Sequence, residues 1–178
     1  MTDPMSELEP LLDRWTTFYV IMSGAAAALI GLLFVVVTFA AERRLKEAGR
    51  IRIYLTPTVI YFSSVLCLAT LLTFPNHTRL TATVCICLLG GFGLFYSGAL
   101  FARRDIRKSY QDLHDLMAYV GLPFAAYGLV VWGGVLLLED TQRGLTLVAA
   151  GMVSLLAIAI RNSWAITVDI VSTPGGQH

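Results

Sequence analysis

The sequence predicts an all-α protein, a polytopic transmembrane helical bundle of five helices with its N-terminus outside and its C-terminus inside. Composition is the first observation: 56% of the 178 residues are hydrophobic and only 14% are charged, whereas soluble domains carry about 45–50% apolar and about 25% charged residues. Long uncharged runs are the second observation. The third is that the basic residues gather between those runs.

The expected spans follow from the uncharged runs, because a helix that crosses a membrane needs about 20 apolar residues. Four runs of 22 to 27 residues carry no charge, and a fifth run of 17 residues starts at Gly144 and ends before Arg161. Arg161 lies about 26 Å along that helix, near the far side of a hydrocarbon core about 30 Å thick, where its side chain can reach the headgroups. The expected spans are 15–41, 53–74, 80–102, 116–138 and 144–168.

The loop charges predict the orientation of these spans. Loop 42–52 carries five Lys and Arg residues and loop 103–115 carries four, whereas loops 75–79 and 139–143 carry one each. Basic loops stay in the cytoplasm. The acidic N-terminal segment is therefore expected outside.

Residues 1–171 are expected to form a single transmembrane domain, followed by a disordered tail at 172–178. Apolar residues recur at helical spacing in loop 103–115. This loop is therefore expected to extend the third span or to form a short interfacial helix.

Two prolines lie inside expected spans, Pro57 in the second and Pro123 in the fourth. Proline removes a backbone hydrogen bond and bends a helix, so both are hinge candidates, with a static kink as the alternative. Each is followed four residues later by a tyrosine, Tyr61 or Tyr127. The second and third spans, and the fourth and fifth spans, could therefore be two copies of one repeated hairpin, an arrangement known in transporters. Chance also explains so few matching residues.

Small and weakly polar residues recur along the spans. In the first span, Gly24 with Ala28 and Ala27 with Gly31 form small-xxx-small pairs, which let helix backbones approach closely in lipid. Steps of seven residues in other spans keep hydroxyl groups and glycines on one face. The pattern predicts an oligomer interface or a pore lining, with packing inside one bundle as the alternative. The candidates are Gly24, Ala27, Gly31, Thr56, Ser63, Thr70, Gly90, Ser97, Ser154, Arg161 and Asn162.

Arg161, next to Asn162, is the one ionisable residue that intrudes on an expected span. It is expected either to line an anion-selective ring in an oligomer or to pair with Glu42 or Asp105. Trp164 would anchor the helix at the interface in both cases.

Residues that could carry chemistry are missing from the expected spans. The cores of the first four spans contain no ionisable Asp, Glu, Lys, Arg or His residue, which argues against a proton pump and a carboxylate-coupled transporter. No nucleophile–histidine pair, glycine-rich phosphate loop, zinc spacing or pair of haem-binding histidines is present. We therefore expect no enzymatic activity, no catalytic residue, no metal and no cofactor. A net charge of +1 gives no attraction to nucleic acids.

The segment from Trp15 to Thr38 and the closing segment Ile160-Arg161-Asn162-Ser163-Trp164 resemble a group of small bacterial integral membrane proteins. Some members carry the label "modulator of FtsH protease". The usual closing pattern has an acidic residue directly after the tryptophan, whereas Ala165 stands there in this chain and Asp169 follows later. The resemblance implies a multi-pass protein of the bacterial cytoplasmic (inner) membrane and implies no reaction.

Two functions fit these expectations. The first is a homo-oligomer that forms a small channel or pore, because weakly polar seams recur without catalytic groups. The second is an accessory or regulatory subunit that binds another membrane complex, such as a membrane protease. The expected partners are accordingly membrane lipids, further copies of the chain and, in the second case, another membrane protein.

Overall fold

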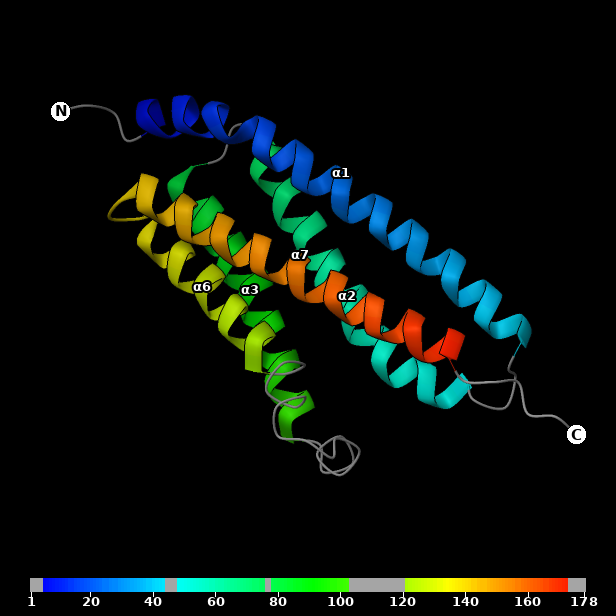
Figure 1. The fold of residues 1–178 in the computed structure, drawn as a ribbon. Coiled ribbons are helices and arrows are strands. Elements are labelled where there is room, and N and C mark those ends of the chain that lie inside the picture. The colour runs from blue at the N-terminus through cyan, green and yellow to red at the C-terminus, as the bar shows by residue number, and fades with distance from the viewer. Residues whose placement is uncertain (1–4, 44–47, 76–77, 103–120, 173–178) are drawn as a thin grey trace, which may run out of the picture.

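The computed structural model describes residues 5–43, 48–75, 78–102 and 121–172, and every regular element in these ranges is a helix (Figure 1). The all-α prediction is therefore confirmed for the described part of the chain. The expected loop 103–115 lies wholly outside it, and so does the expected disordered tail 172–178 except for Ser172, which the structure places at the end of a helix instead. The helices are α1 (Met5–Arg43), α2 (Ala48–Thr73), α3 (Arg79–Ala102), α6 (Leu122–Leu136) and α7 (Thr141–Ser172).

Four of these helices are long and apolar enough to cross a membrane. The apolar segments are Arg14–Thr38, Leu55–Thr73, Arg79–Leu100 and Thr141–Ala165, and they match four of the expected spans. The fifth helix, α6, has 15 residues and a length of about 22 Å, short of the roughly 30 Å hydrocarbon core. The expected fourth span begins at residue 116, and residues 116–120 lie outside the described ranges.

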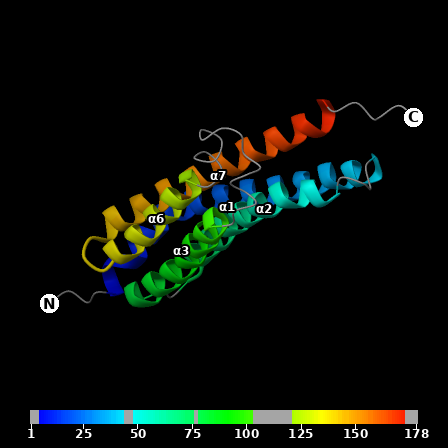
Figure 2. The same ribbon diagram turned by 90° about the horizontal axis from the view of Figure 1, so that it is seen from below.

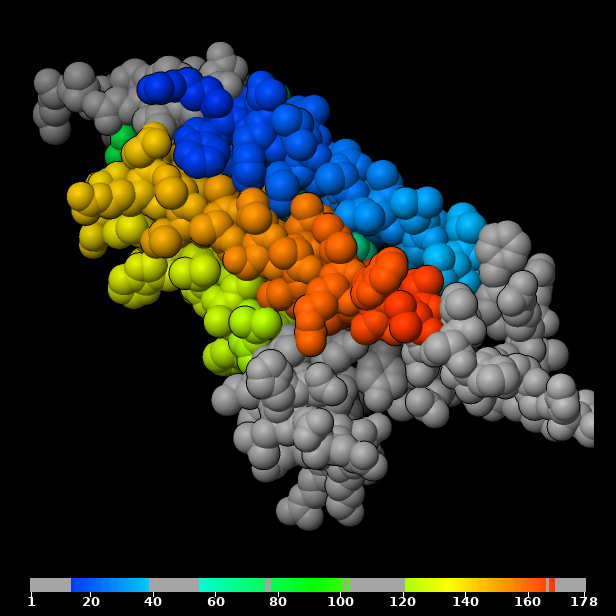
Figure 3. Space-filling model, in the orientation of Figure 1, coloured from blue at the N-terminus to red at the C-terminus, as the bar shows by residue number. Residues whose placement is uncertain are grey.

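The helices pack in a spatial order that differs from their order in the chain. α6 and α7 form an antiparallel hairpin, and α3 packs on α6. α2 packs on α7, and α1 packs mainly on α2. Two perpendicular views show α1, α2 and α7 extending together beyond the ends of α3 and α6 (Figures 1 and 2). On the surface, α1 lies alongside α7 (Figure 3).

Short turns join the helices at one end of the bundle, and side-chain caps begin the helix after each turn. Before α3, the backbone N–H of Thr81 donates to Oγ1 of Thr78 at 3.1 Å. Before α7, the N–H of Arg143 donates to Oδ1 of Asp140 at 3.1 Å, and the two side chains form an ion pair at 3.2 Å. Such caps bond N–H groups that have no partner inside the helix.

Glycines set the close approach of α6 and α7. A Cβ atom on Gly133 would lie 2.8 Å from the carbonyl oxygen of Gly144, and one on Gly144 would lie 2.8 Å from the backbone nitrogen of Leu137. Further along, a Cβ atom on Gly151 would lie 2.9 Å from the carbonyl oxygen of Ala126. Without Cβ atoms, the two backbones touch directly, as small residues permit between helices in lipid.

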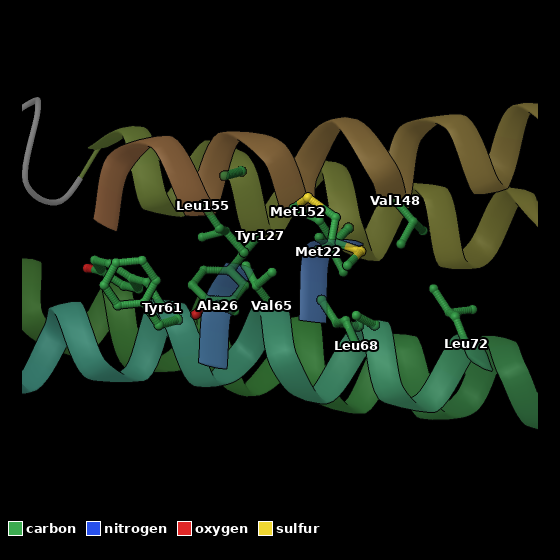
Figure 4. Packing of buried hydrophobic residues seen from close by; sticks show 14 of the residues in the cluster. Met22, Ala26, Tyr61, Val65, Leu68, Leu72, Tyr127, Val148, Met152 and Leu155 are labelled. Carbon is green, nitrogen blue, oxygen red and sulfur yellow. The ribbon is translucent and has the colours of Figure 1, made fainter. Parts of the chain in front are cut away.

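A continuous apolar core runs through the middle of the bundle (Figure 4). α1 contributes Met22 and Ala26, α2 contributes residues such as Val65, and α7 contributes residues such as Met152 and Leu155. The outer surface is also apolar: Phe95 is 75% exposed and Leu88 is 68% exposed. Large apolar side chains this exposed are unusual for a protein surrounded by water.

Candidate functional site

The outward side of α2 carries a line of weakly polar side chains. Thr56 and Thr70 are exposed and Ser63 is partly exposed, so three predicted residues share this side. Cys67 lies between Ser63 and Thr70 and is also exposed. We call Thr56, Ser63, Cys67 and Thr70 the α2 stripe. Cys67 was missed as a member, although its offsets of four and three residues from its neighbours place it on the same helical face.

The three candidates of α1 also lie on the outside of the subunit. Gly24, Ala27 and Gly31 are exposed, and a Cβ atom on Gly24 or Gly31 would meet nothing within 4 Å. The opposite side of α1 enters the core through residues such as Leu33. We call Gly24, Ala27 and Gly31 the α1 small-residue face.

The candidates of α3 lie inside the subunit. A Cβ atom on Gly90 would lie 2.8 Å from Cγ2 of Val131 on α6, and Ser97 is completely buried. Residues spaced seven apart therefore face the outside of the subunit on α2 and its interior on α3.

Cys67 and Cys87 lie in different environments. Cys87 lies against α6, with its Sγ 3.9 Å from the carbonyl oxygen of Val131, whereas Cys67 is on the outward side of α2. All three cysteines are free.

The candidates of α7 fall into three environments. Ser154 donates its hydroxyl hydrogen to the carbonyl oxygen of Ala150 at 2.8 Å. Asn162 is 1% exposed, and among the residues that the structure describes neither polar atom of its amide has a hydrogen-bond partner. Arg161 is exposed. Its expected partners lie outside the described part, Asp105 as a whole and Glu42 with its side chain.

The two prolines occupy different positions in their helices. Pro57 is buried in the interior of α2. Pro123 lies in the first turn of α6 as the structure describes it, and the residues before 121 lie outside the described part. A hinge role remains a prediction for both residues.

The tyrosines that follow these prolines meet in the core. The ring centres of Tyr61 and Tyr127 are 6.2 Å apart, and the two side chains lie next to each other between α2 and the α6–α7 hairpin (Figure 4). The Tyr127 hydroxyl lies 2.7 Å from Oγ of Ser64 on α2. The equal Pro–Tyr spacing is visible in the sequence, but spacing alone does not predict this contact.

Comparisons with protein-family models, with curated proteins and with solved structures find no match for this chain. Within the described residues, no group of three or more His, Cys, Asp or Glu side chains is placed to hold a metal ion. The α2 stripe and the α1 small-residue face are the candidate functional surfaces.

Proposed function

We propose that this chain is a five-span protein of the bacterial inner membrane that assembles from identical copies around a small pore, with the α2 stripe as its lining. The observation that carries the proposal is the outward position of this stripe on a surface that also exposes many large apolar side chains. The N-terminus lies outside and the C-terminus inside in this proposal, because that orientation keeps nine of the thirteen Lys and Arg residues in two cytoplasmic loops.

The exposed apolar side chains support residence in a bilayer. In water this surface would favour aggregation, whereas lipid tails solvate it without cost. The fifth span, 116–138, stays part of this proposal, with α6 as its described portion.

Assembly gives the α2 stripe a favourable environment. Hydroxyl and thiol groups that face lipid find no partners other than their own helix, whereas a central axis can supply water. The α1 small-residue face supplies a close helix contact between neighbouring copies, because Gly24 and Gly31 leave room for a second backbone. A lining of neutral groups favours passive conduction over ion coupling.

The second candidate function is an accessory subunit that binds another membrane protein. The α1 small-residue face also carries this candidate, since a foreign helix can pack there as closely as a second copy. The first and last segments resemble proteins labelled "modulator of FtsH protease". This resemblance suggests a membrane protease as the class of partner. Co-purification from native membranes distinguishes the two candidates.

Native Cys67 provides a direct test of the pore. In a Cys85→Ala, Cys87→Ala background, a charged, membrane-impermeant thiol reagent applied to proteoliposomes should modify Cys67 and change the ion flux. Thr70→Cys, with Cys67 also replaced by alanine, should react in the same way. Both thiols should react because a water-filled pore lets the charged reagent reach them.

The matched control is Leu88→Cys in a background without native cysteines. Leu88 is 68% exposed on the outer surface of α3, so this thiol should react with a membrane-permeant maleimide and not with the charged reagent. The pore is refuted when Cys67 resists the charged reagent as fully as Leu88→Cys and the purified protein conducts no ions.

A further inference from the structure

The C-terminal half of α7 presents a strip of open side chains to the outside of the subunit. Val153 is 48% exposed, Ile160 is 44% exposed and Trp164 is 71% exposed. Arg161 is exposed next to them. α7 forms part of one open face of the molecule, beside α1 (Figure 3). The strip is therefore in contact with whatever surrounds the helix.

The position of Arg161 along α7 corresponds to the edge of a membrane. Arg143, at the start of α7, precedes Arg161 by 18 residues, which is about 27 Å along the helix axis. A hydrocarbon core is about 30 Å thick, and the stretch between the two arginines carries no charge. A long basic side chain at this depth directs its charged group to the lipid headgroups. Arg161 therefore lies at the level of the phosphates of one leaflet.

Arg161 and Trp164 together supply donors for a phosphate group. Side chains three residues apart on a helix are neighbours, about 5–6 Å apart between Cβ atoms. The guanidinium group has five N–H donors and the indole ring has one. Arg161 has an interaction within the chain, and its other donors can bind a phosphate oxygen in addition. The planar guanidinium group also matches the geometry of a phosphate.

The residues on the membrane side of Arg161 suit an acyl chain. Ile160, Ala157 and Val153 are all exposed, and their spacing of three and four residues places them in one line along the helix. This apolar line leads from Arg161 toward the middle of the membrane. The described acidic side chains, Glu139 and Asp140, precede α7 at its other end. The strip thus combines one cationic end with one apolar end.

We propose that Arg161 and Trp164 form a binding site for an anionic phospholipid such as phosphatidylglycerol. Its phosphate binds the guanidinium group and the indole N–H, and one of its acyl chains lies along Ile160, Ala157 and Val153. A basic residue at the membrane surface favours anionic over zwitterionic lipid by about fivefold. The site rests on the bilayer residence in the proposed function, but it does not depend on the pore at the α2 stripe.

Quenching of tryptophan fluorescence by brominated lipids tests the site. With Trp15→Phe and Trp132→Phe, Trp164 is the single tryptophan of the chain. The bilayers contain phosphatidylglycerol and phosphatidylcholine in equal amounts, and the bromine is carried by the acyl chains of one lipid or the other. Phosphatidylglycerol should be enriched about fivefold next to Trp164, so its brominated form should quench more strongly. Arg161→Gln should abolish this preference.

The chain offers two matched controls. Arg143→Gln removes the same charge from the other end of α7, where Arg143 is paired with Asp140, and it should leave the preference at Trp164 unchanged. Trp132, kept as the single tryptophan, is 63% exposed on α6 and has no basic residue within four positions, so both brominated lipids should quench it equally.

Two results overturn the site while leaving bilayer residence intact. One is equal quenching of Trp164 by the two brominated lipids, and the other is a preference that survives Arg161→Gln. Bilayer residence itself fails, and the site with it, when neither lipid quenches Trp132.

Discussion

Replacing Gly93 by alanine tests the contact between α3 and α6. A Cβ atom at this position would lie 2.1 Å from Cε1 of Tyr127, whereas ordinary contacts begin at 3.4 Å. The Tyr127 ring is fully buried and bonded to Ser64, so it has to move against packed neighbours and stretch that hydrogen bond. Overpacking costs about 1–3 kcal/mol and the lost hydrogen bond about 0.5–1.5 kcal/mol, while alanine returns up to about 1 kcal/mol of helix propensity.

We expect a net loss of about 1–3 kcal/mol and a Tm lower by roughly 5 °C, measured by thermal unfolding in lipid nanodiscs. Gly91→Ala is the matched control on the same helix, because a Cβ atom there meets nothing within 4 Å. Its Tm should be unchanged or slightly higher. Tyr127→Leu should recover part of the loss in Gly93→Ala by removing the ring. Equal Tm values for Gly91→Ala and Gly93→Ala would refute this reasoning.

Three further predictions concern other positions. Gly31→Leu should leave the Tm of the subunit within about 2 °C, because no described atom lies within 4 Å of a Cβ atom there. The same change should convert the oligomer to smaller species in cross-linking and native gels. An unchanged oligomer contradicts a role of Gly31 in assembly. Asn162→Leu should raise Tm by about 2–4 °C, since both amide atoms are buried without partners in the described part of the chain. A lower Tm would show that the amide is bonded in the native assembly. Asp140→Ala should lower Tm by a similar amount through loss of the α7 cap. Asp140→Asn keeps a capping oxygen and should retain most of the stability. An equal loss of Tm in both variants would indicate that the ion pair with Arg143 is the stabilising contact instead.

The helices themselves could be predicted from the sequence because spanning a membrane is a local property. About twenty apolar residues without a charge are enough to predict a helix that crosses lipid, and four of the five expected spans appear as long apolar helices. Within the expected span 116–138 the structure describes a helix of 15 residues, α6, so the fifth span remains a prediction. The lining role of the α2 stripe and the orientation of the chain remain predictions.

The contacts between helices could not be predicted in the same way. The close approach of α6 and α7 depends on Gly133 and Gly144, and neither residue was singled out beforehand. Tyr127 occupies the space left by Gly93, a pairing of residues 34 positions apart in the sequence. Such fits depend on which helices become neighbours.

The sequence alone determined that the chain forms apolar helices and that Thr56, Ser63 and Thr70 share one helical face. Only the tertiary structure decided where that face points. The equivalent series on α3, from Thr83 through Gly90 to Ser97, is buried inside the subunit, whereas the α2 series lies outside. The physical reason is that a helix in lipid is apolar on every side, so no amphipathic pattern orients it. Its rotation is set by the fit of glycines against large side chains on neighbouring helices.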